Sequence, residues 1–444
     1  MNLATRIGLL SGLAAGAAFG LVTVASQIAA LLSPGLEVDF NQDYLLAEAI
    51  RHGIDPNMGL HQLAVALGMP GLIQADYPTP HPPTAGLLLL PLAWLPQTIA
   101  SVVWLLVSFG ALTWAIALLS RLAGIRLPAW LILPVSLAAL FWEPLSQDVG
   151  WGQMNAIMLA LLAGVLVALS TNRRTLAGVL LAVSLLLKPV AWPLLLLLLV
   201  RRDWRAAGSC LLVGGVVGVI TAIAVGPLRL VDYFIHSLPV ATAYFRLDAF
   251  NISLASLGTR LFVGAEYPPG APTLHFAPLF YSPLAATVLG ACITVAVLAA
   301  GLIVAKRLPL QAALSCMVIV SLLITPTAWD HYLVLTLLPV ALLIAALRRH
   351  AWPSQVTRCS VVLLALMALP APLWEQRLNM APFQATDSYW PVASSALALM
   401  PAYLLVALAV LGIIIERERG LIPAVITRPQ SRLGPDAGAS LQLA

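Results

Sequence analysis

Apolar stretches of about 20 residues recur along most of this chain and are separated by short polar segments. Runs of that length and composition are typical of transmembrane helices. A helix satisfies its own backbone hydrogen bonds in lipid, so the pattern predicts an all-α, polytopic integral membrane protein that needs no sheet. We expect about twelve transmembrane helices, at residues 7–32, 84–119, 128–143, 153–170, 175–187, 190–200, 206–226, 282–304, 310–325, 330–347, 359–372 and 391–414.

Prolines make two of these spans less regular than the others. The span 84–119 contains Pro91 and Pro96, and the hairpin 175–200 is interrupted by Lys188 and Pro189. Proline removes a backbone donor and kinks a helix, so both regions are expected to bend or break.

Basic residues gather at alternate ends of the predicted spans and indicate an orientation, because Lys and Arg favour the cytoplasmic side. Most acidic residues fall on the opposite side, so the outer face carries most of the polar chemistry, and both chain ends are expected inside. The basic groups are Arg6; Arg121 and Arg126; Arg173 and Arg174; Arg201, Arg202 and Arg205; Lys306 and Arg307; Arg348, Arg349 and Arg358; and Arg417 and Arg419.

Composition supports this class of protein and excludes others. Hydrophobic residues make up 61% of the 444 residues and charged residues only 9%, against about a quarter in soluble proteins. The four cysteines form no CxxC pair, which argues against zinc, redox and disulfide motifs. No group has clear metal-ligand spacing, so we expect neither a metal nor another cofactor. No basic stripe with interleaved aromatic residues points to nucleic acid.

The chain reads as one transmembrane domain, residues 1–419, followed by a tail, residues 420–444, that is expected to be disordered. The first apolar run, from Ile7 to Leu32, is too long for a signal peptide and is expected to be retained as a helix. Three long outer segments, 33–83, 227–281 and 373–390, are expected to contain short interfacial helices.

Ionisable and amide side chains at the outer ends of the spans are candidates for a functional site, since such groups are costly at membrane level. Each also has an ordinary explanation: a solvated loop acid, an interfacial histidine, a helix cap or a snorkelling lysine. The candidates are Asp39, Asp43 and Tyr44 in "EVDFNQDY", His81 in "YPTPHPPTAG", Gln153 and Asn155 in "EPLSQDVGWGQMNAI", Lys188, and Asp330 and His331 in "ITPTAWDHYLVL".

Six segments in this order resemble glycosyltransferase family 87 of the GT-C superfamily, which uses polyprenyl-phosphate sugars at membranes. They are "DFNQDY", "YPTPHPPTAGLLLLPLAWLP", "WGQMN", "LLKPVAWPLLLLLLVRRDWRAA", "NISLASLGTRL" and "ITPTAWDHY". The resemblance covers most of residues 35–350 and implies a GT-C-type fold. The family includes actinobacterial mannosyltransferases and an arabinofuranosyltransferase.

The resemblance also assigns roles to individual residues. Asp39 matches the acid that is the presumed catalytic base, and His331, Lys188 and Arg260 match residues expected near the donor phosphate. Tyr332 stands where a second histidine is common, which puts any role of that position in doubt. Residues expected to contact substrate are Asp43, Tyr44, His81, Gln153, Asn155 and Asp330.

These observations favour an inverting glycosyltransferase, most simply a mannosyltransferase, of the bacterial cytoplasmic membrane. Its expected partners are a polyprenyl-phosphate sugar donor, a lipid-linked or glycan acceptor and membrane lipids, with the active site facing outward. Arabinofuranosyl transfer is the nearest alternative. A lipid or sugar transporter is disfavoured, because transporters place their sites near the midplane between repeats. A membrane scaffold leaves the polar outer loops unexplained, and the sequence indicates no oligomeric state.

Overall fold

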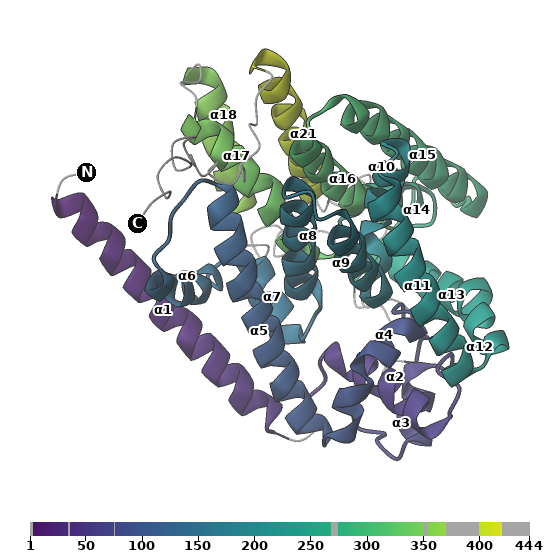
Figure 1. Cartoon of the computed structure of the whole chain (residues 1–444). Helices are drawn as coiled ribbons and strands as arrows, with labels where there is room; N and C mark the ends of the chain where they lie inside the picture. Colours follow the sequence, from purple (N-terminus) through teal and green to yellow (C-terminus); the bar gives the residue numbers. More distant parts are fainter. Residues whose placement is uncertain are drawn as a thin grey trace, which may run out of the picture.

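The computed structural model describes residues 3–33, 36–74, 76–267, 274–349, 354–369 and 399–419. Within these ranges the chain is almost entirely helical (Figure 1), which confirms the prediction of an all-α polytopic membrane protein. One small exception to the expected absence of a sheet is an antiparallel pair of strands, β1 (Ala265–Tyr267) and β2 (Leu274–Phe276), in the segment 227–281.

Fewer helices than expected are long enough to cross a membrane alone. Among the described residues, five segments meet the length and hydropathy of a full span, and a sixth forms if two helices bent by 88° are counted together. The long elements are α1 (Leu3–Leu31), α5 (Gln97–Leu122), α11 (Trp204–Val225), α15 (Pro283–Arg307) and η5 (Asp330–Thr336) with α17 (Leu337–Arg349); the bent pair is α6 (Ala129–Ala139) and α7 (Glu143–Trp151).

Seven shorter apolar helical segments of 10–17 residues cover most of the remaining predicted spans. Several of them are almost wholly buried in the bundle, so they need not match the full thickness of the lipid. They contain α4 (Pro83–Leu89) with η1 (Leu90–Trp94), α8 (Asn155–Ser170), α9 (Arg174–Leu187), η2 (Pro189–Ala191) with α10 (Trp192–Val200), α16 (Leu310–Ile324), α18 (Ser354–Met367) and α21 (Met400–Arg419).

The predicted span 84–119 is in fact two elements. The η1 helix ends at Trp94, and Pro96 then takes an extended conformation, with φ −52° and ψ 142°, at the start of α5. The residue before a proline avoids the helical region, so the chain turns at Leu95 rather than continuing. Consequently α5 alone forms the long span, and α4 packs on α2 (Phe40–His52).

Short helices occupy the outer segments 33–83 and 227–281, as the sequence predicted. The helix α2 is buried from Phe40 to Ile50, so it packs into the bundle instead of lying on an interface. The other short elements are α3 (Leu60–Ala66), α12 (Pro227–Asp232), η3 (Tyr233–Ser237), α13 (Leu238–Arg246), η4 (Leu254–Ser256) and α14 (Leu257–Phe262). The predicted segment 373–390 and the tail 420–444 lie outside the described residues.

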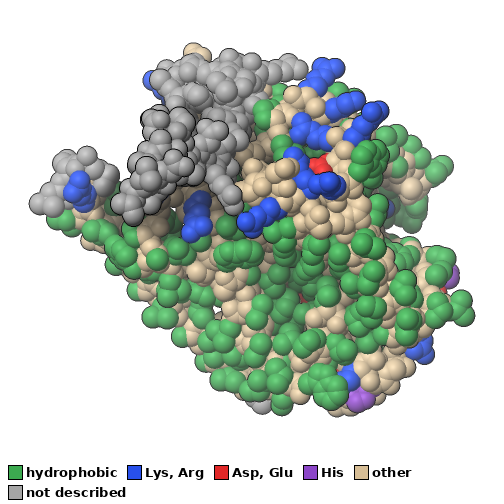
Figure 2. Space-filling view, viewed as in Figure 1, with side chains coloured by type: hydrophobic (Ala, Val, Ile, Leu, Met, Phe, Trp, Pro, Cys, Tyr) green, Lys and Arg blue, Asp and Glu red, His purple; other side chains and the backbone are tan. Residues whose placement is uncertain are grey.

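Polarity is distributed unevenly over the surface. Figure 2 shows hydrophobic side chains over most of the visible face and Lys and Arg side chains gathered toward its upper part. Large apolar side chains on α1, α11 and α15 are exposed, among them Val22, Ile223 and Leu284, whereas α8 and α16 are mostly buried. We call the end that carries Arg174, Arg202 and Lys306 the basic end.

Close helix packing at the α9–α11 contact depends on Gly178. A Cβ atom added there would lie 2.1 Å from the Ala206 carbonyl oxygen and 2.1 Å from Ser209 Oγ. We therefore expect Gly178→Ala to push the two helices apart and to destabilise the protein by roughly 1–3 kcal/mol. Thermal unfolding of the detergent-solubilised protein measures this change.

A glycine on the same helix pair supplies the control. Gly208 lies on α11, and a Cβ added there meets no atom within 4 Å. Gly208→Ala should therefore keep or slightly raise the unfolding temperature, since alanine favours a helix more than glycine does. Equal unfolding temperatures for the two variants would contradict the packing role of Gly178.

Candidate active site

A cavity of about 440 Å³ lies where the predicted polar residues converge. Its volume is in the range of pockets that bind small molecules, roughly 300–1,000 Å³. Six of the ten predicted site residues line it, and they come from five separate segments of the chain: Asp39, His81, Gln153, Lys188, Asp330 and His331. We call it the polar cavity.

A hydrogen-bonded chain connects a carboxylate and an ammonium group in the polar cavity. Gln153 Nε2 donates to Asp39 Oδ2 at 2.5 Å, and Lys188 Nζ donates to Gln153 Oε1 at 3.0 Å. Lys188 Nζ also lies 4.0 Å from the centre of the Tyr332 ring, in a cation–π contact. The glutamine amide thus holds both charged groups without a direct salt bridge between them.

Local backbone structure explains how these three side chains meet. Asp39 is the N-cap residue of α2, but its side chain makes no capping bond and is therefore available to Gln153. Gln153 follows Gly152, whose φ of 70° ends α7 and turns the chain into α8. Lys188 is only 4% exposed and takes an extended conformation at the break between α9 and η2.

The electrostatics of Asp39 suit a general base. Burial raises the pKa of this carboxyl above its usual range, and the Gln153 hydrogen bond and the positive charges of Lys188 and His81 offset part of the rise. A carboxylate with a raised pKa is a stronger base than an ordinary aspartate, provided that it is deprotonated at the working pH.

His81 is held by a buried partner. Its Nδ1 lies 2.6 Å from Asp43 Oδ1, and since a carboxylate only accepts, Nδ1 is the donor. Asp43 itself does not line the polar cavity and lies behind His81. Its expected contact with substrate stays a prediction.

His331 presents an imidazole nitrogen that has no protein partner. The ring of Trp329 stacks on the His331 ring, with centroids 5.9 Å apart and an interplanar angle of 22°. Among the described residues, nothing hydrogen-bonds the buried His331 Nε2 atom. A buried nitrogen without a partner is costly, so this atom is well placed to meet a ligand.

Arg260 does not line the polar cavity, and its expected contact with a donor phosphate stays a prediction. Its side chain is 2% exposed, and Nη2 donates to the carbonyl oxygens of Ala249, at 2.9 Å, and of Asn251. Asn251 in turn donates to the Pro326 carbonyl at 3.0 Å and accepts from the Ala328 amide at 3.1 Å. Arg260 therefore fixes the loop that supports the segment just before Trp329.

Two other predicted contacts are structural as well. Asn155 Nδ2 donates to Asp148 Oδ1 at 2.7 Å, and the Asp148 carboxylate also accepts from the first amides of α8, so this pair caps the helix. Tyr44 OH donates to Glu48 Oε1 at 3.0 Å and to the Leu95 carbonyl at 2.8 Å. Neither Asn155 nor Tyr44 lines the polar cavity.

Sequence reasoning missed an aromatic wall of the polar cavity. Tyr77 stacks on Tyr244 with centroids 4.8 Å apart, and Phe245 meets Trp329 edge to face at 5.1 Å. Four aromatic residues within "YFRLDAFN" and "DYPTP" were visible in the sequence, but aromatic residues are common wherever a chain meets a membrane interface. Their convergence on one cavity appears only in the fold.

Asp248 is a second carboxylate of this wall that the sequence did not single out. It accepts hydrogen bonds from Trp329 Nε1 at 3.1 Å and from the Phe250 amide at 2.8 Å. Burial raises the pKa of Asp248, and these two hydrogen bonds and the charge of Arg260 offset part of the rise. Asp248 thus orients the indole that stacks on His331.

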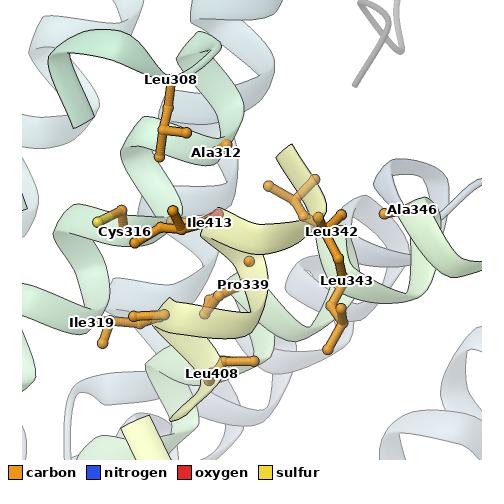
Figure 3. A pocket seen from close by; sticks show the side chains of 14 residues that line it. Leu308, Ala312, Cys316, Ile319, Pro339, Leu342, Leu343, Ala346, Leu408 and Ile413 are labelled. Atoms are coloured by element: carbon orange, nitrogen blue, oxygen red, sulfur yellow. The ribbon is translucent and has the colours of Figure 1, made fainter. Parts of the chain in front are cut away.

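Other features of the fold are less suited to chemistry. Among the described residues, no group of three or more His, Cys, Asp or Glu side chains could hold a metal ion. A further cavity of about 60 Å³ between α16, α17 and α21 is lined by apolar side chains together with Ser315 and Cys316 (Figure 3). It holds no acid, base or cation, so the polar cavity is the candidate active site.

Comparison with known proteins identifies the family of this chain. Residues 79–326 match the sequence profile of Glycosyltransferase family 87. The chain is 32% identical over 124 residues to an alpha-(1->3)-arabinofuranosyltransferase of Corynebacterium glutamicum, covering 28% of this chain and 29% of that protein. It is 29% identical over 197 residues to an enzyme of the same name from Mycobacterium tuberculosis, covering 43% of this chain and 44% of that protein.

The match to each of these relatives spans less than half of the relative's length. The family profile, by contrast, covers more than half of this chain and includes three of the six predicted residues that line the polar cavity, His81, Gln153 and Lys188. The chain therefore belongs to glycosyltransferase family 87.

Proposed function

We propose that the polar cavity transfers a sugar from a polyprenyl-phosphate donor to a hydroxyl group of a lipid or glycan acceptor, with inversion at the anomeric carbon. The observation that carries this proposal is the chain Asp39–Gln153–Lys188, which brings a base and a cation to one cavity at fixed separation. A transferase with a phosphate leaving group needs both.

The reaction follows from the positions of these groups. Asp39 takes the proton of the acceptor hydroxyl as its oxygen bonds to the anomeric carbon. The bond from that carbon to the phosphate oxygen breaks, and its electron pair leaves with the phosphate. Lys188 stabilises the growing negative charge on the phosphate, because a fixed cation in a water-poor site interacts strongly with it. One displacement of this kind inverts the anomeric centre.

Gln153 separates the base from the cation, so that both remain available to the substrates. A direct salt bridge would favour the ionised carboxylate and reduce its basicity, and would also occupy the ammonium group. With the amide between them, Lys188 Nζ retains donors for a phosphate and Asp39 retains a lone pair for the acceptor hydroxyl. Gln153 is therefore a positioning residue in this proposal rather than a sugar contact.

The identity of the sugar is a separate question. The motifs alone led us to expect mannose, whereas the two relatives are named as arabinofuranosyltransferases. We therefore propose an arabinofuranosyl donor as the first candidate and a mannosyl donor as the second. The aromatic wall of Tyr77, Tyr244, Phe245 and Trp329 offers ring faces to either sugar or to the first isoprene units.

We also propose that the polar cavity faces outward from the cytoplasmic membrane. Arg174 of the basic end starts α9 and Lys188 of the polar cavity follows its last residue, so the two lie at opposite ends of this helix, and Lys and Arg favour the cytoplasmic side.

The central experiment uses the full chain reconstituted in liposomes with synthetic radiolabelled polyprenyl-phosphate arabinofuranose or mannose and membrane-lipid acceptors. We expect labelled product from one donor, with NMR showing the anomeric configuration opposite to that of the donor. Retained configuration would contradict single displacement. Passage of intact donor across the membrane without transfer would favour the transporter alternative.

We expect His331→Ala to weaken use of the donor more than use of the acceptor. The unpartnered Nε2 atom would contact the donor phosphate, and a hydrogen bond to a charged group contributes roughly 1.5–3 kcal/mol, or about 10- to 150-fold in kcat/KM for the donor. Steady-state kinetics at varied donor and acceptor concentrations separate the two effects.

The control is His236→Ala, because His236 is exposed, pairs with Asp232 and does not line the polar cavity. It should leave both kinetic constants unchanged. If His331→Ala lowers the unfolding temperature but retains full activity per folded molecule, His331 only anchors the helix and the phosphate contact is wrong.

A further inference from the structure

A second large cavity, at the basic end, is unused by the proposed reaction. It measures about 780 Å³ and lies among the start of α9, the turn between α10 and α11, the end of α15 and the start of α16. Four cations and one carboxylate line it: Arg174, Arg201, Arg202, Lys306 and Asp203. We call it the basic cavity; Figure 2 shows Lys and Arg side chains gathered in this part of the molecule.

Two of the four cations brace the walls of the basic cavity. Arg174 Nη1 lies 2.5 Å from Asp203 Oδ2 and so ties the start of α9 to the α10–α11 turn. Arg201 Nη2 donates to the Leu308 carbonyl oxygen and so ties the end of α10 to the α15–α16 turn. Asp203 also accepts from the Ala206 amide at the start of α11. The carboxylate of Asp203 therefore already has hydrogen-bond partners within the protein.

The other two cations have no such role. Within the described residues, no hydrogen bond or ion pair involves the side chain of Arg202 or of Lys306. Arg202 also has a φ of 57°, in the left-handed region that favours glycine just after a helix. The only other described non-glycine residue with positive φ is Asn172, a type that tolerates this conformation. An arginine here is locally unfavourable, which indicates a use for its charge.

The surroundings of the basic cavity are those of a lipid boundary. Trp204 and Val200, beside the cavity, are exposed, as are Leu212 on α11 and Ile303 on α15. Exposed tryptophans and apolar helix faces at the end of a span mark the level of lipid headgroups. A ligand with a negative head and apolar chains could place its head in the cavity and its chains along these helices.

We propose that the basic cavity binds the headgroup of an anionic phospholipid from the leaflet at the basic end. Arg202 and Lys306 contact the lipid phosphate, while Arg174 and Arg201 hold the walls in place. Basic pockets between transmembrane helices are suited to such headgroups, and each Lys or Arg near an anionic membrane surface adds to the attraction. This site is independent of the donor, the acceptor and the direction of sugar transfer.

The experiment compares the full chain in nanodiscs of neutral phosphatidylcholine with and without phosphatidylglycerol. Thermal unfolding and native mass spectrometry of retained lipid are the readouts, so the result does not depend on transferase activity. The test variant is Arg202→Gly with Lys306→Gln, which removes both unpaired charges and gives the turn a residue that suits positive φ. We expect an affinity loss of about fivefold for each charge removed.

The matched control is Arg121→Gln with Arg126→Gln, which removes the same charge from the basic end but outside the basic cavity. It should keep the preference for phosphatidylglycerol, whereas the test variant should lose that preference while remaining folded in neutral lipid. An equal loss in the control would overturn the site and leave only a general surface attraction. Equal stabilisation by inorganic phosphate in neutral nanodiscs would overturn the lipid as its occupant.

Discussion

Asp39→Asn should reduce turnover by at least the roughly 100-fold that is typical of lost general-base catalysis. Asparagine keeps the shape of the side chain and can still accept a hydrogen bond from Gln153, but it cannot take the proton of the acceptor hydroxyl. Binding of the donor should be almost unchanged. The measurement is single-turnover transfer in liposomes, alongside donor affinity under conditions in which the acceptor is absent.

The thermal stability of Asp39→Asn provides a second test. Burial raises the pKa of Asp39, which means that the fold disfavours the ionised form. The folded protein then binds a proton more tightly than the unfolded chain, so stability falls as pH rises from the ordinary aspartate pKa to the raised one. At neutral pH, Asp39→Asn removes this penalty, and we expect an unfolding temperature equal to or above that of the original protein.

A pH profile adds a third measurement to this prediction. The base acts only when it is deprotonated, so activity should be lost as pH falls through the raised pKa of Asp39, above the ordinary value of about 3.9. The control Asp55→Asn changes an exposed carboxyl near Arg229, outside the polar cavity, and should change neither turnover nor the profile. Near-normal turnover in Asp39→Asn would remove Asp39 from the mechanism.

Much of the fold could be predicted because lipid restricts the alternatives. An apolar run of sufficient length has to form a helix, so every long span found here corresponds to a predicted one. The prolines predicted a bend or break near Leu95 and Pro96, but they did not predict that two separate helices would form there. Proline limits the local backbone, but it does not reveal that α4 packs on α2.

Part of the site could be predicted because ionisable groups at membrane level are costly and therefore often functional. Asp39, Lys188 and His331 are far apart in the sequence, but each lies at the end of a helix. The structure brings all three to one cavity. The sequence around Arg260 could not show that three backbone carbonyls of one loop accept from its Nη2 atom, whereas Nε and Nη1 have no partner among the described residues. A buried arginine can be satisfied by carbonyl groups as well as by an anion.

Asn155 and Gln153 are nearby residues whose different roles could not be distinguished from the sequence. They are two residues apart, and both were equally plausible as sugar contacts or helix caps. The structure separates them: Asn155 pairs with Asp148 at the start of α8, whereas Gln153 reaches Asp39 and Lys188. The difference arises from Gly152, whose left-handed backbone turns Gln153 toward the cavity before α8 begins.

Lys188→Met should lower turnover by about 10²–10³-fold, the range observed when a fixed group that stabilises the developing negative charge is removed. Methionine has a similar length and fits a buried position, but it carries no charge and makes neither the Gln153 hydrogen bond nor the Tyr332 cation–π contact. Lys188→Arg keeps the charge and should restore part of the activity. Steady-state transfer with saturating acceptor measures both variants.

The pH profile of the residual activity distinguishes this role from a purely structural one. Lys188 lowers the pKa of Asp39 through its positive charge, so its removal should raise that pKa further. The acid limb of the Lys188→Met profile should therefore move to higher pH, whereas Lys188→Arg should leave it close to its original position. A variant that merely loosened the fold would lose amplitude without moving the limb, because the charge acting on Asp39 would be unchanged. A limb that stays in place in Lys188→Met would thus show that the ammonium group does not act on the base, and the coupling through Gln153 would be wrong.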